Sequence, residues 1–182
     1  TFDSRAYSPV FISKDSSIAF ISTYDGGQNL NLFNLKTKKS KQITKFDERP
    51  MISHLNYDEL SHSLYFDITF HHFREIYNYN FNDSAITTFK NNTLYDERNM
   101  AFDSFSGVKI YSRDKSGIFN LYMVDEKNES EGYISNVTGG AFMPDISNDG
   151  KIIFSLFQNG GYKISVLEES VFINDNFALM LR

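Results

Sequence analysis

A length of 182 residues, a formal net charge of −5 and the absence of cysteine exclude several classes of protein. The acidic balance argues against nucleic acid as a partner, because proteins that bind its phosphate backbone carry basic patches. The lack of thiols excludes disulfides and Cys-based zinc sites, and no apolar run is long enough to cross a membrane as a helix.

In chain order, the sequence reads as four repeats of one strand pattern, about 44 residues apart. Each repeat passes from a turn into an apolar strand, then through a second turn into another strand. The first strand carries an aromatic anchor at Phe20, Phe66, Tyr111 and Phe154. The second strand carries an anchor at Phe33, Tyr77, Tyr122 and Ser165. A threonine ends the unit at Thr1, Thr44, Thr93 and Thr138.

The fourth repeat shows the predicted elements most clearly. Residues 148–151 form a tight turn, in which Asp149-Gly150 supplies the positive φ that a short hairpin needs. Residues 152–156 and 162–167 are the two strands, and the glycine-containing segment 158–161 is the turn between them. A short fourth strand is predicted before the threonine of other repeats. The second repeat lacks the glycine turn.

A period of 40–50 residues with several short strands is typical of an all-β propeller, in which each repeat is one four-stranded blade. We therefore predict four blades within residues 1–169, followed by a tail or a further segment at 170–182. The predicted blades span approximately 1–45, 46–94, 95–139 and 140–169. Because an open ring would expose strand edges, we expect these blades to be part of a larger propeller.

The strongest candidate for a binding feature is an aromatic-Asp-x-Arg motif that follows the repeat threonine three times. Its charged members are Asp3, Arg5, Asp47, Arg49, Asp96 and Arg98. In a propeller these turns would lie on one face around the channel, where arginine suits bidentate contacts with carboxylates. The predicted partner is a protein or peptide segment at that face. Alternatively, Asp of one repeat pairs with Arg of the next, or caps its own turn.

Catalytic and metal-binding patterns are missing from the sequence. It has no Gly-x-Ser-x-Gly elbow, phosphate loop, dinucleotide glycine pattern or His-Glu-x-x-His helix. His71 and His72 are neighbours in a predicted turn and do not form a ligand set. Scattered carboxylates at Asp67, Asp103 and Asp145 leave a glycosidase as a less favoured alternative. We expect no catalytic residue, cofactor or metal, and no enzymatic activity from this chain alone.

Three segments carry a resemblance to the TolB-type family of β-propellers, whose WD40-like repeats contain a Pro-Asp pair. Residues 147–154, Ser-Asn-Asp-Gly-Lys-Ile-Ile-Phe, resemble the family's Ser-Pro-Asp-Gly-Lys-x-Ile-x-Phe core. Residues 117–125 are similar to its Gly-x-x-x-Ile-Tyr-x-x-Asp strand, and Ile43-Thr44 and Val137-Thr138 match its Leu-Thr ending. The usual Pro-Asp pair is degraded throughout. The resemblance covers roughly residues 1–168 and implies a propeller of about six blades.

The resemblance implies a non-catalytic, protein-binding scaffold of the bacterial cell envelope. Its place would be the periplasm or the outer membrane, by fusion to or contact with an outer-membrane component. The alternative is the gating propeller of a prolyl-oligopeptidase-like serine peptidase, which carries related repeats.

Overall fold

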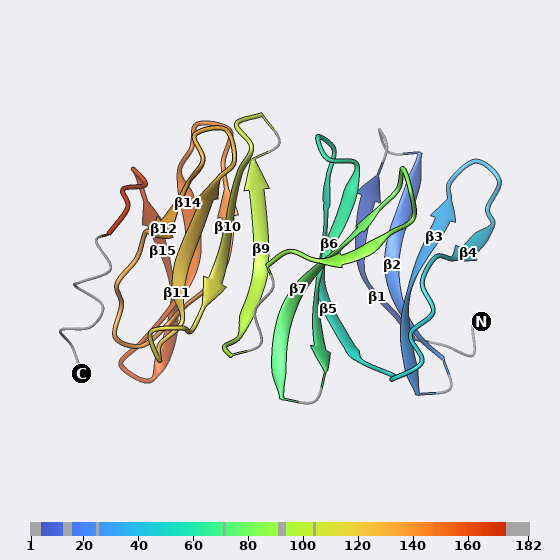
Figure 1. Cartoon of the computed structure of the whole chain (residues 1–182), viewed down its shortest axis with the longest axis horizontal. Coiled ribbons are helices and arrows are strands. Elements are labelled where there is room, and N and C mark those ends of the chain that lie inside the picture. Colours follow the sequence, from blue (N-terminus) through green and yellow to red (C-terminus); the bar gives the residue numbers. More distant parts are fainter. Residues whose placement is uncertain are drawn as a thin grey trace. The chain divides into compact units, whose positions relative to one another are not determined.

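The computed structural model describes residues 5–12, 16–24, 26–70, 72–90, 94–103 and 105–173. Within these ranges the chain forms fifteen strands and no helix, which confirms the predicted all-β class (Figure 1). The chain divides into two compact units, Thr1–Asn91 and Asn92–Arg182. All strand pairs are antiparallel, and each sheet follows the order of the sequence.

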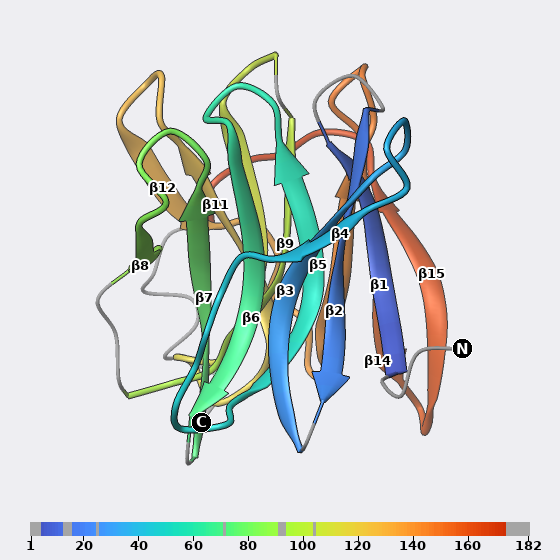
Figure 2. The same cartoon turned by 90° about the vertical axis from the view of Figure 1, so that its right-hand side faces the viewer.

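The first unit contains two four-stranded sheets (Figure 2). The first sheet consists of β1 (Arg5–Ile12), β2 (Ser17–Tyr24), β3 (Gly27–Asn34) and β4 (Ser40–Gln42). The second sheet consists of β5 (Met51–Asp58), β6 (Ser63–Phe70), β7 (Phe73–Asn80) and β8 (Ile86–Thr88). In both sheets the fourth strand is only three residues long.

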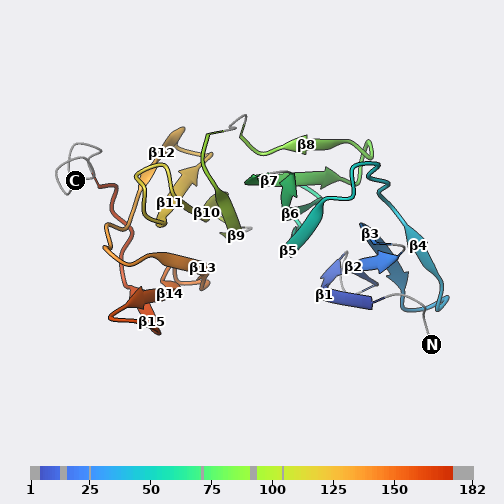
Figure 3. The same ribbon diagram turned by 90° about the horizontal axis from the view of Figure 1, so that it is seen from below.

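The second unit contains one four-stranded and one three-stranded sheet (Figure 3). The third sheet consists of β9 (Glu97–Asp103), β10 (Val108–Arg113), β11 (Asn120–Asp125) and β12 (Ser130–Tyr133). The fourth sheet consists of β13 (Ala141–Ile146), β14 (Ile152–Gln158) and β15 (Gly161–Leu167). Among the described residues the fourth sheet has no fourth strand. Instead, Ile173 forms an isolated bridge with Tyr133, at the end of β12.

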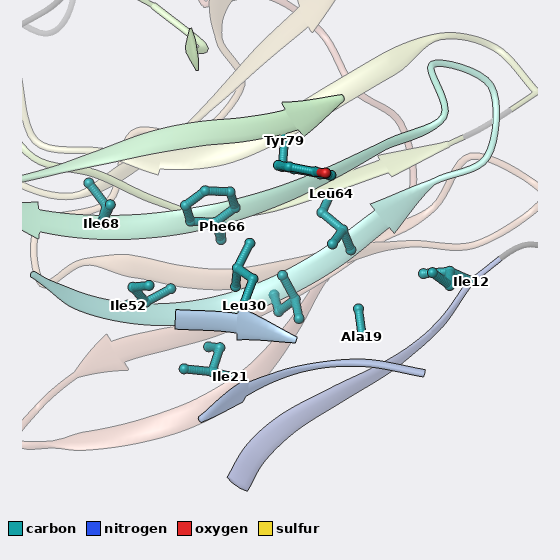
Figure 4. Close-up of a cluster of buried hydrophobic side chains, with 10 residues drawn as sticks. Ile12, Ala19, Ile21, Leu30, Ile52, Leu64, Phe66, Ile68 and Tyr79 are labelled. Atoms are coloured by element: carbon teal, nitrogen blue, oxygen red, sulfur yellow. The ribbon is translucent and has the colours of Figure 1, made fainter. Parts of the chain in front are cut away.

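Each unit has its own apolar core between its two sheets. Side chains alternate along a strand, so Ala19 and Ile21 of β2 share one face of the first sheet. Leu64 and Phe66 of β6 meet them from the second sheet, with Leu30 between (Figure 4). The core of the second unit contains Ile110, Leu121, Met123, Ile134, Ala141, Ile152 and Phe154.

Strand register confirms one of the two predicted sets of anchors and corrects the other. Phe20, Phe66, Tyr111 and Phe154 lie at equivalent positions of the second strands. Their partners on the third strands are Asn31, Tyr77, Tyr122 and Ser165. The predicted anchor Phe33 was therefore two residues out of register. An aromatic pattern favoured Phe33, but cross-strand pairing places the polar Asn31 there.

A hydroxyl group that links the third strand to the segment after the fourth strand shows which residue ends each repeat. We call this pair of hydrogen bonds the clamp. The Thr44 Oγ1 accepts a hydrogen bond from the Leu30 N–H at 2.9 Å and donates one to the Asn29 Oδ1 at 3.2 Å. In the third sheet Ser135, not Thr138, does this: its Oγ accepts from the Leu121 N–H at 2.8 Å and donates to the Asn120 Oδ1 at 3.0 Å. Thr138 lies three residues beyond the clamp. Thr1 and Thr93 lie outside the described residues.

Every first strand carries a β-bulge at which a residue other than glycine adopts a positive φ. These residues are Ser8, His54, Asn99 and Met143, with φ of 49°, 48°, 59° and 51°. The pairing register of β1, β5, β9 and β13 shifts at the same places. A bulge adds one unpaired residue and bends its strand, so this irregularity belongs to the repeat.

Candidate functional site

The predicted Asp-x-Arg residues lie at or just before the start of the first strands. In the first copy, Asp3 lies outside the described residues and Arg5 is an exposed residue at the start of β1. In the second copy, Asp47 and Arg49 are exposed in the segment before β5. Arg49 lies against the turn between β2 and β3, because a Cβ added to Gly26 would be 3.5 Å from its Nη1.

The third copy forms a close ion pair within itself. The Arg98 Nη2 lies 2.5 Å from the Asp96 Oδ2, and each side chain is 23% exposed. The Asp96 N–H donates to the Asp114 Oδ1 at 2.8 Å, which ties the pair to the turn after β10. Of the predicted site residues, the structure thus brings Asp96 and Arg98 together. They pair within one copy of the motif.

The bulges show that the three copies are not structurally equivalent. Arg5 precedes its bulge residue Ser8 by three positions, Arg49 precedes His54 by five, and Arg98 immediately precedes Asn99. The motif recurs in the sequence, but each arginine stands at a different distance from the bulge of its first strand. A shared binding role for all three copies stays a prediction.

A row of aromatic rings continues from Arg98 across one end of the second unit. The Arg98 guanidinium carbon lies 4.2 Å from the centroid of the Phe119 ring. Phe119 contacts Phe142, with ring centroids 5.1 Å apart, and Phe142 contacts Tyr162 at 6.2 Å. Phe157 also contacts Tyr162, with ring centroids 5.1 Å apart. Such a surface combines apolar area with a charged pair, as protein-binding surfaces often do.

Packing explains why the fourth repeat has Gly139-Gly140 in place of the charged motif. A Cβ added to Gly139 would lie 1.9 Å from the Phe157 carbonyl oxygen. Gly140 has a φ of +133°, and a Cβ there would lie 2.6 Å from the Phe142 ring. The end of β14 and the Phe142 ring of β13 therefore occupy the space that side chains would need.

Glu97 and Arg113 form a buried ion pair next to this site, which the sequence did not predict. Glu97 is 1% exposed, and its Oε1 lies 3.3 Å from the Arg113 Nε. The Arg113 guanidinium carbon lies 4.5 Å from the Tyr95 ring centroid and 4.4 Å from that of Tyr122. Glu97 occupies the position of the Asp-x-Arg motif at which any residue is allowed, so the motif does not mark it. The signal that the sequence offered was its position at the start of a strand.

Burial and charge change the pKa values in this cluster. Burial lowers the pKa of Arg113, but the hydrogen bond with Tyr95 and the nearby Tyr111 and Glu97 outweigh it, so the net shift is upward. Burial, reinforced by the negative charge of Glu97, raises the pKa of Tyr111 well above its usual range. The cluster thus holds a charged arginine and a neutral tyrosine. We interpret this cluster as a structural element, because the side chains of Glu97 and Arg113 are only 2% and 11% exposed to a partner.

A hollow on the first sheet and the histidines are the remaining candidate sites. A hollow of about 400 Å³ on the first sheet is lined mainly by apolar side chains, among them Ile18, Phe20 and Phe33. In the part of the chain that the structure describes, no three His, Asp or Glu side chains gather as a metal site would require. His71 lies outside that part, and the His62 Nδ1 is 2.8 Å from the Tyr57 hydroxyl.

Comparison with known proteins shows the fold. The sequence matches no known family model, and no curated protein is recognisably similar. TolB from Acinetobacter baumannii has a similar structure, with a TM-score of 0.73 and 20% identity over 90% of this chain and 41% of that chain. A TolB-type structure from Agrobacterium tumefaciens has a TM-score of 0.71 and 13% identity, over 91% of this chain and 59% of that chain.

A puromycin-hydrolysing peptidase from Mycobacterium tuberculosis is similar to a comparable degree. Its TM-score is 0.71 at 12% identity, over 91% of this chain and 30% of that chain. The chain has the fold of a TolB-like β-propeller. It spans less than two thirds of each of these proteins. Among the described residues there is no helix long and apolar enough to cross a membrane.

Proposed function

We propose that this chain is a non-catalytic, protein-binding part of a propeller that resembles TolB and acts as an interaction scaffold in the bacterial cell envelope. Its place would be the periplasm or the outer membrane, in association with a component of that membrane. The partner is a protein or peptide segment that carries a carboxylate and an apolar residue. The proposed contact residues are those of the motif: Asp3, Arg5, Asp47 and Arg49 in the first unit, and Asp96 and Arg98 in the second.

The observation that carries the proposal is the partly exposed Asp96–Arg98 pair beside the aromatic row. Arg98 is held in place by the ring of Phe119 below it and by the carboxylate of Asp96. An arginine held in this way loses little side-chain entropy on binding and can donate charge-assisted hydrogen bonds to a carboxylate. Phe142 and Tyr162 supply apolar area for the rest of a bound segment.

A second candidate is the gating propeller of a prolyl-oligopeptidase-like serine peptidase. The structural similarity to the puromycin-hydrolysing peptidase favours it to the same degree as TolB. In that case the catalytic serine would belong to another part of the full-length protein, and this chain would control access to it.

Charge reversal tests the proposed surface. The purified chain is immobilised and incubated with a periplasmic extract of the cells that make it, and bound proteins are quantified by mass spectrometry. We expect Arg49→Glu combined with Arg98→Glu to reduce the capture of specific partners about tenfold or more, because a carboxylate would meet like charge. The matched control is Lys127→Glu, in the exposed turn after β11.

The result would contradict the proposal if the double variant, with an unchanged circular dichroism spectrum, captured the same proteins in the same amounts as the control. A separate assay decides between the two candidates. A fluorophosphonate probe for serine hydrolases should leave the full-length protein unlabelled. Labelling would support the peptidase.

A further inference from the structure

The turn between β3 and β4 concentrates positive charge on a chain whose formal net charge is −5 (Figure 1, light blue). Of the six residues 36–41, four are lysines: Lys36, Lys38, Lys39 and Lys41. We call these four residues the lysine turn. All four are exposed, and among the described residues none of them takes part in an ion pair. The positive charge is therefore open to a partner.

Hydrogen bonds to Asn34 hold the backbone of the lysine turn in place. The Asn34 Oδ1 accepts from the N–H groups of Lys36 and Thr37, at 3.0 Å and 2.8 Å. The Lys38 N–H donates to the Asn34 carbonyl at 2.9 Å, and the Asn34 N–H donates to the Lys39 carbonyl at 2.9 Å. These bonds use only main-chain groups and the side chain of Asn34, so the lysine side chains are not needed to form the turn.

The second and third sheets form the same turn without the lysines. The acceptor side chain is Asn80 in the second sheet and Asp125 in the third. The pairing of the third and fourth strands makes residues 82–87 and 127–132 equivalent to 36–41. The first of these segments has one charged residue, an aspartate, and the second has one lysine and two glutamates. The fold therefore does not explain why the first sheet has four lysines here.

Protection of the sheet edge does not explain them either. Lysines within an edge strand can prevent its pairing with other strands. However, only Lys41 lies within β4, and the other three lysines precede the strand. The strand β8 is also the outer strand of its sheet and carries no charged residue.

A further sheet packed on the first one would leave the lysine turn exposed. Phe66 of the second sheet packs against the first sheet, and Phe20 is its equivalent on the first sheet. Although the first sheet covers that face of the second, residues 82–87 of the second sheet are all exposed. A sheet that covered Phe20 in the same way would contact the face of the strands and not the turn.

The composition of the lysine turn fits an anionic lipid surface better than an acidic protein or a nucleic acid. The residues between the lysines are Thr37 and Ser40, so the turn has no large apolar or aromatic residue around which a protein interface could be built. It also has no arginine for bidentate contacts and no ring on which a base could stack. Lysine is a compact charge on a flexible stem, which suits the additive attraction of a charged membrane.

We propose that the lysine turn docks this chain on a membrane surface that carries anionic phospholipids. The four ammonium groups contact the headgroup phosphates. Salt screens charges beyond about 8 Å at physiological ionic strength, so the nearby lysines outweigh the more distant acidic residues. The inference goes beyond the proposed function, because it concerns a lipid surface and four residues outside the Asp-x-Arg motif.

Vesicle sedimentation tests the proposal. The full chain is mixed, at about 0.1 M salt, with vesicles of equal parts phosphatidylglycerol and phosphatidylcholine, or with vesicles of phosphatidylcholine alone. The turn variant combines Lys36→Gln, Lys39→Gln and Lys41→Gln. It keeps Lys38, whose φ of 56° makes a substitution there a change of backbone strain as well as of charge.

The matched control removes the same charge from three exposed positions outside the turn. It combines Lys115→Gln, Lys127→Gln and Lys163→Gln. We expect wild type to bind the anionic vesicles and not the neutral ones. The turn variant should bind them about tenfold more weakly or less, because each lysine near such a surface contributes roughly a fivefold factor. The control should bind nearly as well as wild type, and both variants should keep the circular dichroism spectrum of wild type.

A footprint locates the contact without any substitution. Anionic vesicles should slow the acetylation of the lysine turn, read by mass spectrometry of peptides, and leave that of Lys127 unchanged. A structural role of the lysines would not produce this protection.

Three results would overturn the proposal. The first is equal binding of wild type to anionic and neutral vesicles. The second is an equal loss of binding in the turn variant and the control, because the attraction is then not local. The third is tighter binding to poly-glutamate or to a single-stranded oligonucleotide than to vesicles at the same concentration of negative charge, because the partner is then an acidic protein or a nucleic acid.

Discussion

At the residue scale, Gly139 is the position where packing leaves least room for change. A Cβ there would overlap the Phe157 carbonyl, which is backbone and cannot rotate away. We expect Gly139→Ala to lower the free energy of unfolding by roughly 1–3 kcal/mol or more, as measured by urea denaturation. Gly161→Ala is the matched control, because nothing lies within 4 Å of its added Cβ. Equal stability of the two variants would contradict this packing.

Also at the residue scale, Tyr111 makes the free energy of unfolding depend on pH. Burial raises its pKa above the usual value of about 10, so in strong alkali the unfolded chain loses this proton first. The contribution of Tyr111 to stability is complete below about pH 10 and is lost as the pH rises further, by about 1.4 kcal/mol per pH unit. We expect Tyr111→Phe to flatten the fall in the free energy of unfolding above about pH 10. Parallel profiles for variant and wild type in urea titrations would refute this.

At the scale of the element, the bulge in each first strand sets where the neighbouring side chains point. Met143 has a φ of 51° in the bulge of β13 and is 62% exposed. The effect of a substitution on stability therefore depends more on its backbone conformation than on side-chain contacts. Glycine tolerates that conformation, whereas a β-branched residue is strained in it.

We expect Met143→Gly to keep or raise the free energy of unfolding by up to about 1 kcal/mol, and Met143→Val to lower it by about 1–2 kcal/mol. Thermal unfolding followed by circular dichroism measures both. Met51→Val, at an exposed position of β5, controls for the change of side chain. If Met143→Val is as stable as Met51→Val, the bulge is not a fixed feature of the strand.

At the scale of the whole molecule, the two units have separate apolar cores. Phe66 is 1% exposed in the core of the first unit. We expect Phe66→Ala to cost roughly 3–5 kcal/mol and to raise amide hydrogen exchange in β1–β8 before it does so in β9–β15. Leu60→Ala, at a position that is 68% exposed, should change neither. Uniform loss of protection would show one cooperative unit.

The sequence by itself determined the features that depend on neighbouring residues. Alternating apolar residues predicted the strands, and Asp149-Gly150 predicted a turn that Gly150 forms with a φ of 82°. The aromatic anchors Phe20, Phe66, Tyr111 and Phe154 predicted equivalent positions, because they recur at the period of the repeat.

Only the tertiary structure decided features that depend on pairing between distant segments. Arg5, Arg49 and Arg98 stand at different distances from the bulges of their first strands, so the three copies of the motif are not structurally equivalent. Among the described residues Ile173 bridges to Tyr133 and β15 is the outer strand of its sheet, and Glu97 and Arg113 form a buried ion pair. Hydrogen bonds between strands and the exclusion of water set these arrangements, and neither is visible in the spacing of residues along a chain.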